Sequence, residues 1–222
     1  MFTRIQVIGS GRVGGAIAGR LREHGVEPAA AEPELVLLCI PDSAIAEVAR
    51  SIDPGPWIAH VSGATPLSAL DPHVHRFSVH PLQTFTTKRG PDQLDGAWAA
   101  VTGDGADALA QGFALAQLLG LRPFELADDA RTLYHAGAVF ASNYLVTLHR
   151  AAASLFDAAG APPRALEPLM LRTIENEFEL TGPIARRDWT TVDAHRRAIR
   201  EHRPELDELY DKLADATLEL AT

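Results

Sequence analysis

The sequence predicts an α/β fold, in which a parallel β-sheet with flanking helices is followed by an all-helical region. Short apolar runs alternate with helical patterns between residues 5 and 126, as is typical of a sheet built from strand–helix–strand units. From residue 128 onward, three helical patterns follow one another with no convincing strand between them. We therefore predict two domains, residues 1–127 and residues 128–222.

The elements begin with a strand at Ile5–Ile8, which leads through a glycine turn into a helix at Val13–His24. The continuous apolar run Leu35–Ile40 ends at a proline and is typical of a strand that is buried on both faces. Asp42 and Ser43 then stand where side chains can cap the next helix. Further strands are expected at 57–61, 76–79, 98–101 and 121–126, and further helices at 44–51, 106–119, 131–159, 163–180 and 188–220.

Composition and charge exclude several classes of function. The net charge of −9 argues against a nucleic-acid-binding protein, because such proteins usually carry basic patches. The single cysteine, Cys39, cannot form an intrachain disulfide and suits a reducing cytoplasm. The apolar run at the N-terminus is too short for a signal peptide, and no apolar stretch is long enough to span a membrane. From the cysteine count and the absence of a signal peptide, we expect a cytoplasmic protein. No cysteine–histidine cluster has metal-ligand spacing, so we expect no metal site.

A glycine-rich loop follows the first strand and opens the first helix, and this context raises the pattern above a chance match. In Gly9-x-Gly11-x-x-Gly14, the first glycine permits a tight turn, the second lets a pyrophosphate approach the backbone, and the third lets the helix pack on the strand. The alternative is a glycine turn that only packs the helix. The context favours a dinucleotide loop, with cofactor contacts from Gly9, Ser10, Gly11, Arg12, Val13 and Gly14.

The stretch after this helix is too short for a complete dinucleotide-binding fold. Gly14 and Leu35 are 21 residues apart, and one helix fills most of that gap. Residues 26–33 cannot hold a further strand and its helix, because a parallel crossover needs about a dozen residues or more. We therefore expect the strands that hold the adenosine half to be absent, and NAD or NADP to bind weakly. Glu32 or Glu34 can replace the usual ribose-binding carboxylate, but solvated loop carboxylates are the more favoured interpretation.

Five segments in order carry a resemblance to a known family, namely Val7–Gly14, Cys39–Ile45, His80–Phe85, Tyr134–Asn143 and Thr181–Asp188. With these segments, the chain resembles a bacterial family that joins a Rossmann-like domain to a C-terminal helical domain of unknown function. The resemblance covers nearly the whole chain. That family is related to pyrroline-5-carboxylate reductase, prephenate dehydrogenase and 6-phosphogluconate dehydrogenase. The resemblance implies an NADP- or NAD-dependent oxidoreductase acting on a small molecule, with Ile40, Pro41 and Asp42 over the nicotinamide.

The resemblance and the usual handedness of crossovers disagree about one strand. A right-handed connection through a single helix would place Leu35–Ile40 on the adenosine side of Ile5–Ile8. The family instead has this strand on the nicotinamide side. We predict that the family position holds, with Val26–Pro33 as the loop that reroutes the chain, and that the adenosine-side strands are missing.

Three residues are candidates for catalysis, and a fourth is a candidate for substrate binding. His80 is expected at the C-terminal end of a strand, where open α/β sheets bind their ligands. Its imidazole can exchange a proton with a carbonyl or alcohol, although a histidine that only fixes the loop is as well supported. The resemblance points to His135 and Asn143 on the helix that follows. Arg186 can bind a substrate carboxylate through two hydrogen bonds, with a surface pair to Asp188 as the alternative.

Two classes of function stay open from the sequence. The first is the NAD(P)-dependent oxidoreductase, and the second is a non-catalytic small-ligand-binding protein that has lost its dinucleotide. The stretch 136–148 is rich in small and apolar residues, and in related dehydrogenases such a helix packs against a partner subunit. We therefore also expect a homodimer formed by the helical domain.

Overall fold

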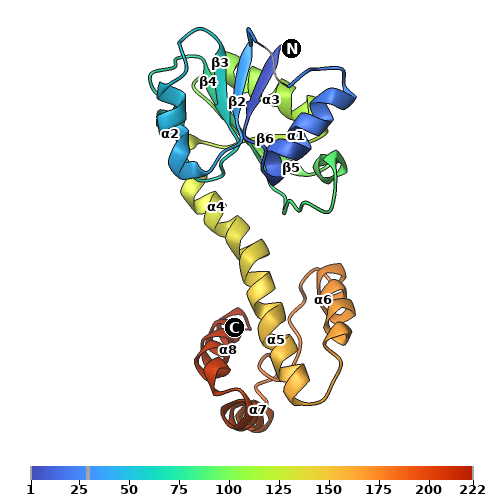
Figure 1. The fold of residues 1–222 in the computed structure, drawn as a ribbon. Coiled ribbons are helices and arrows are strands. Elements are labelled where there is room, and N and C mark those ends of the chain that lie inside the picture. The colour runs from blue at the N-terminus through green and yellow to red at the C-terminus, as the bar shows by residue number, and fades with distance from the viewer. Residues whose placement is uncertain (1, 29–30, 222) are drawn as a thin grey trace. The chain divides into compact units, whose positions relative to one another are not determined.

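The computed structural model describes residues 2–28 and 31–221 (Figure 1). The chain divides into two compact units, Met1–Phe140 and Ala141–Thr222. Residues 128–140, which the sequence pattern groups with the helical domain, therefore lie in the unit that contains the sheet.

The first unit is built on a six-stranded sheet whose strands are neighbours in the order β1 to β6. β1 to β4 are parallel, β5 is antiparallel to β4, and β6 is parallel to β5. The predicted α/β fold with a Rossmann-like sheet is confirmed, and the reversal at β5 is a feature that the sequence pattern did not indicate. The strands are β1 (Ile5–Ile8), β2 (Leu35–Leu38), β3 (Trp57–His60), β4 (Arg76–Pro81), β5 (Trp98–Gly103) and β6 (Arg122–Glu125).

Helices cover both faces of the sheet. On one face, α1 (Arg12–Glu23) and α3 (Ala106–Leu118) pack over Leu35 and Leu37 of β2. On the other face, α2 (Asp42–Arg50) and the 3-10 helix η1 (Leu67–Leu70) pack over the alternate residues of the same strand. All four β2 residues are fully buried, which agrees with the two-sided burial predicted from the apolar run.

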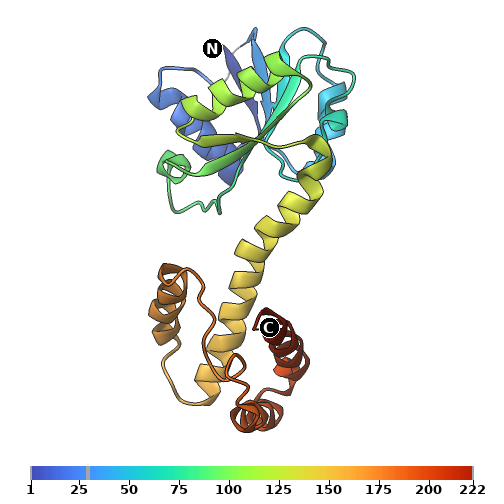
Figure 2. The same cartoon turned by 180° about the vertical axis from the view of Figure 1, so that it is seen from behind.

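The connection from β1 to β2 has an unusual hand. The crossovers through α1 and α2 move across the sheet in the same direction, yet the two helices lie on opposite faces. The two connections therefore have opposite hands. Figure 2 shows α3 in front of the sheet, with the strands running downward and β2 to the right of β1. Because α1 packs on the same face as α3, the α1 crossover is left-handed.

Residues 29 and 30 of the predicted rerouting loop, Val26–Pro33, lie outside the described residues, but Pro28 bonds the outer edge of β1. The backbone N–H of Val7 donates to the carbonyl of Pro28 over 2.9 Å, so this loop bonds the strand where a further strand would lie. Within the described residues, β1 is an edge strand and the adenosine-side strands are absent. The Glu34 carboxylate accepts from the backbone N–H groups of Thr3 and Arg4 over 2.8 and 3.2 Å, at the amino end of the sheet. It therefore lies away from the ribose position.

The second unit is helical and contains few buried side chains. The sequence pattern predicts one helix over 188–220, but the structure has two helices, because Pro204 follows the end of the first. Arg196 of α7 pairs with Asp211 of α8 over 2.7 Å and links them. No helix among the described residues combines the length and the apolar character needed to cross a bilayer. The helices are α5 (Leu145–Ala158), α6 (Leu166–Glu175), α7 (Trp189–His202) and α8 (Asp207–Leu220), after α4 (Arg131–Val139) of the first unit and a π-helical stretch at Phe140–Tyr144.

Candidate functional site

The glycine loop has the geometry that its spacing predicts. Gly9 has a φ of +114°, and a Cβ there would lie 2.2 Å from the carbonyl oxygen of Cys39. A Cβ on Gly14 would lie 2.1 Å from the carbonyl oxygen of Gly9, so α1 packs directly on the loop. Only glycine fits these two positions. By contrast, a Cβ on Gly11 or Gly15 would meet no atom within 4 Å.

The N-terminus of α1 is suited to an anion. Gly11 is the N-cap residue and makes no side-chain capping hydrogen bond, and the first turn holds no acidic residue. The free N–H groups and the helix dipole therefore favour a phosphate at this end. Arg12 and Val13 are the first residues of the helix, and Ile40 lies next to Gly9 on the loop. The residues present thus fit the pyrophosphate of a dinucleotide.

A second set of polar side chains gathers at the carboxyl ends of three parallel strands. Asp42 follows β2, Ser62 and Gly63 follow β3, and His80 lies at the end of β4. Because β2, β3 and β4 are parallel, their carboxyl ends share one edge of the sheet. This edge is where ligand sites of open α/β sheets are found.

His80 is enclosed by the start of α4. Its Nδ1 lies 2.8 Å from the Tyr134 hydroxyl, and its ring meets that of His135 edge-on with centroids 5.9 Å apart. A Cβ on Gly63 would lie 2.9 Å from Nε2 of His80 and 2.7 Å from Cδ2 of His135. The missing side chain of Gly63 therefore gives both imidazoles their space, and the structure brings the two separately predicted candidates, His80 and His135, together.

The surroundings keep His80 neutral. Burial lowers the pKa of His80 to about 4, and the neighbouring His135 and Arg131 add to this effect. Burial also raises the pKa of Tyr134 to about 12. At neutral pH the pair is therefore a neutral imidazole hydrogen-bonded to an intact phenol. Such a pair can donate a hydrogen bond to a carbonyl or take a proton from an alcohol.

Arg131 is buried beside this cluster, with 1% of its surface exposed. It donates to the hydroxyls of Ser78 and Thr102 over 2.5 and 2.9 Å and to the carbonyl of Ser62. Its nearest carboxylate, that of Asp128, is 3.9 Å away. Buried guanidinium groups are rare without a close carboxylate, so Arg131 places a poorly compensated positive charge beneath the Ser62–Gly63 turn.

Asp42 has a different role from the one its position suggests. The helix α2 begins at Asp42 itself, with Pro41 as N-cap and no side-chain capping bond, so the expected cap by Asp42 and Ser43 is wrong. The Asp42 carboxylate instead accepts from the Ser62 hydroxyl over 2.8 Å. The same hydroxyl lies 2.9 Å from that of Thr65. These bonds tie the end of β2 to the turn after β3.

Acid is expected to destabilise the first unit through its buried histidines. Burial, reinforced by the charge of Arg131, lowers the pKa of His60 to about 3, and that of His80 is about 4. In the unfolded chain both rings return to about 6.5. The unfolded chain then binds more protons below that pH, so stability present at pH 7 is lost as the pH falls from about 6.5 toward 4. One pKa unit corresponds to about 1.4 kcal/mol, so the loss is on the order of several kcal/mol.

Urea unfolding followed between about pH 7 and pH 4 measures this loss. A His60→Asn variant should have a flatter pH dependence, whereas the exposed His24→Asn should behave as the unmodified protein. If the His60 variant does not fold, imidazole NMR shifts of the unmodified protein give the same answer. Equal stabilities at pH 7 and pH 4.5, or imidazoles of His60 and His80 that titrate near 6.5, would contradict the expectation.

The remaining predicted residues lie in the second unit. Asn143 is exposed and belongs to the π-helical stretch Phe140–Tyr144, a form of helix that often marks functional positions. Arg186 is exposed in the turn before α7. The Asp188 carboxylate accepts from the backbone N–H of Thr191 over 3.2 Å and caps α7, as its position predicts. Among the described residues, no three potential metal ligands form a cluster.

Four residues of the cluster escaped the sequence analysis, although a signal existed for two. Ser62 and Gly63 follow β3 just as Asp42 follows β2, so their place at the sheet edge was readable from the strand ends. Tyr134 lies in a segment that carries the family resemblance but was not singled out, and Arg131 precedes that segment. Only the folded chain shows that both lie beside His80 and the turn after β3.

Comparison with known proteins gives the family of the chain. Residues 97–217 match the family described as Domain of unknown function (DUF2520). The match spans more than half of the chain, and the chain belongs to this family. No curated protein matches the sequence.

Solved structures share the whole fold at low sequence identity. A candidate NADP oxidoreductase from Bacteroides fragilis is 23% identical, with a TM-score of 0.82 over 98% of each chain. A semialdehyde dehydrogenase NAD-binding protein from Cupriavidus necator, in complex with calcium and NAD, is 20% identical, with a TM-score of 0.61 over 100% of this chain and 99% of that chain. A reductive aminase from Aspergillus terreus, in complex with NADPH and ethyl levulinate, is 15% identical, with a TM-score of 0.68 over 99% of this chain and 94% of that chain.

Proposed function

We propose that this member of the DUF2520 family is an NAD(P)-dependent oxidoreductase that acts on a small carbonyl, imine or alcohol. The observation that carries the proposal is the glycine loop, which opens at Gly11 onto an uncapped helix N-terminus without acidic residues. Structural neighbours that bind NAD or NADPH support it. A reducing, cytoplasmic location fits the lone Cys39.

The side chains at the sheet edge would handle the proton of the reaction. When bound, the nicotinamide supplies or accepts the hydride. Nδ1 of His80 lies 2.8 Å from the Tyr134 hydroxyl. In the tautomer in which that hydroxyl donates to Nδ1, the proton is on Nε2, and Nε2–H is the donor toward the substrate. A neutral imidazole stabilises a carbonyl oxygen by this hydrogen bond and, in the opposite tautomer, removes a proton from an alcohol. His135, whose ring meets that of His80 edge-on, flanks it.

Asn143 and Arg186 are proposed substrate contacts that rest on the family resemblance. The amide of Asn143 would orient the substrate, and the exposed Arg186 would pair with a substrate carboxylate. The missing adenosine-side strands lead us to propose weak dinucleotide binding.

Calorimetric titration with NADH and NADPH tests the cofactor, and Gly11→Val provides a matched variant. A Cβ at residue 11 meets no protein atom within 4 Å, so the fold should persist while the valine side chain blocks the approach of the pyrophosphate. We expect the unmodified protein to bind one cofactor per chain and the variant to bind none. Gly137→Ala in α4, where a Cβ also meets nothing, is the control that should bind as the unmodified protein does.

Absence of heat for either cofactor up to millimolar concentration would refute the proposal. Binding that survives Gly11→Val would place the cofactor elsewhere. Consumption of NADPH with a panel of ketones, imines and alcohols then identifies the class of substrate.

We also propose a homodimer formed by the helical unit. Few of its side chains are buried, and several large apolar side chains of α6 and the following turn are exposed, namely Leu169, Leu171, Ile174 and Phe178. Exposed apolar patches of this kind mark interaction surfaces. A monomeric mass in light scattering at micromolar concentration would contradict the dimer.

A further inference from the structure

A pocket of about 480 Å³ lies between the start of α1 and the loop that joins β4 to β5. Gly11, Arg12 and Gly15 line it from the helix, and Thr86, Thr87 and Arg89 line it from the loop. A Cβ on either glycine would meet no atom within 4 Å, so the helix backbone is accessible from the pocket. The pocket therefore continues directly from the glycine loop.

The lining is cationic in a protein whose net charge is −9. The Arg12 side chain makes no hydrogen bond or ion pair with the described residues. Arg89 donates from Nε and Nη2 to the Asp92 carboxylate over 3.2 and 2.8 Å, which leaves its Nη1 unengaged among the described residues. No carboxylate belongs to the described lining. Two guanidinium groups and two threonine hydroxyls are the donors that recognise a phosphate.

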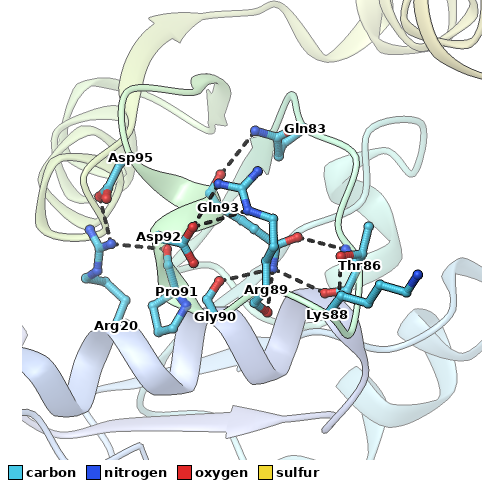
Figure 3. Close-up of polar contacts among 10 residues, drawn as sticks. All are labelled: Arg20, Gln83, Thr86, Lys88, Arg89, Gly90, Pro91, Asp92, Gln93 and Asp95. Atoms are coloured by element: carbon cyan, nitrogen blue, oxygen red, sulfur yellow. Dashed lines mark hydrogen bonds and ion pairs between the residues drawn. The ribbon is translucent and has the colours of Figure 1, made fainter.

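One buried amide holds the loop in shape, as Figure 3 shows. Gln93 is 2% exposed, and its Oε1 accepts from the backbone N–H of Thr86 over 2.8 Å. Its Nε2 lies 3.2, 2.9 and 3.0 Å from the carbonyls of Thr86, Arg89 and Gly90. The backbone at Thr86, Arg89 and Gly90 is thus held in place before a ligand binds, which reduces the entropic cost of binding.

The loop is also fastened to α1. Arg20 of the helix donates to the carbonyl of Pro91 over 3.1 Å and pairs with Asp95 over 2.7 Å. A Cβ on Gly19 would lie 2.6 Å from the Pro91 ring, so helix and loop are in close contact. Thr86 and Arg89 are therefore positioned relative to the glycine loop by the fold itself.

We propose that this pocket binds the 2′-phosphate of NADP(H) and makes the protein prefer NADP(H) to NAD(H). The inference rests on the proposed function. Sites for NAD read the ribose 2′-hydroxyl with a carboxylate at the end of the adenosine-side strand. The described residues form no such strand, and the described lining carries arginines and no carboxylate. The β4–β5 loop thus supplies from the sheet's other half what the missing strand supplies in complete folds.

Titrations with NADPH, NADH, 2′-AMP and 5′-AMP test the assignment, with Arg89→Gln and Arg12→Gln as variants. Lys88→Gln is the matched control, because it removes the same charge from the same loop at a residue outside the pocket lining. A hydrogen-bonded charge pair is typically worth a factor of about ten to a hundred in affinity. We expect NADPH to bind at least tenfold tighter than NADH, and 2′-AMP tighter than 5′-AMP. Arg89→Gln should remove most of this preference while NADH binding stays within about twofold. Arg12→Gln, at a residue of the glycine loop itself, should weaken NADPH binding more than NADH binding.

The possible failures can be told apart. Equal binding of NADPH and NADH would overturn the inference and leave the proposed function intact. Losses of equal size for both cofactors in Arg89→Gln would assign the pocket to the pyrophosphate and likewise overturn it. A loss in Lys88→Gln as large as in Arg89→Gln would reduce the effect to general charge, with the same consequence. Absence of binding by either dinucleotide would refute the proposed function and the inference together.

Discussion

Arg131→Met is expected to destabilise the protein by about 3 kcal/mol, because it leaves buried acceptors unsatisfied. The guanidinium now bonds the hydroxyls of Ser78 and Thr102 and the carbonyl of Ser62. Replacing a buried ion by an apolar residue of similar length relieves desolvation. Here that relief is outweighed, because methionine offers no donor to the Ser62 carbonyl. Chemical unfolding in urea measures the change.

Two comparisons make this expectation specific. Arg50→Met removes an exposed arginine from the last turn of α2 and should change stability by less than about 0.5 kcal/mol. In a folded Arg131→Met protein, the pKa of His80 should rise, because the charge of Arg131 is one of the causes that lower it. An Arg131→Met protein as stable as the original would mean that desolvation of the cation costs as much as its hydrogen bonds contribute.

The buried charge also marks where sequence reasoning fails. In a pattern of apolar and polar residues, Arg131 looks like the solvated start of a helix, since arginine is almost never fully buried. Its burial depends on Ser78 and Thr102, which lie on two different strands. Sequence periodicity describes one element at a time, so it carries no information about contacts among α4, β4 and β5.

The positions of the strands were predictable from the sequence, but the direction of β5 was not. The position of each strand follows from short apolar runs between turns, and all six lie where these runs predict. The direction of β5 does not follow, because an apolar run reads the same in a parallel or an antiparallel neighbour. The split between α7 and α8 was predictable from the sequence. Proline breaks the hydrogen bonding of a helix interior, so Pro204 indicates that the helix ends before it.

The left-handed crossover through α1 shows how length can constrain topology. Residues 26–33 are too few for a strand and a helix, so β2 had to be the next strand after β1. The handedness rule alone would place it on the wrong side of β1. The loop carbonyl of Pro28, bonded to Val7, occupies the edge that the usual second strand would cover. A shortened fold can thus keep the arrangement of its site while breaking a rule that holds for complete ones.

His80→Gln is expected to lower kcat by about 10²- to 10⁴-fold, the usual contribution of a positioned acid or base. Glutamine keeps the size and one hydrogen bond of the imidazole but cannot exchange a proton at neutral pH. Because the glycine loop is unchanged, the dissociation constant for the cofactor should stay within about twofold. Turnover with a substrate from the carbonyl and imine panel, followed by NADPH absorbance, gives kcat, and calorimetric titration gives the dissociation constant for the cofactor.

The pH profile and a tyrosine variant separate a role in proton transfer from a role in packing. With the pKa of His80 at about 4, its protonation should leave kcat/KM unchanged from about pH 5 to pH 8 and lower it only in stronger acid. Tyr134→Phe removes the hydroxyl 2.8 Å from Nδ1 and with it the bond that fixes the tautomer, so kcat should fall by about tenfold. Thermal unfolding of Tyr134→Phe checks that the fold is intact. A His80→Gln enzyme within about threefold of full activity would assign His80 to the support of the sheet edge and move the proton transfer to another residue.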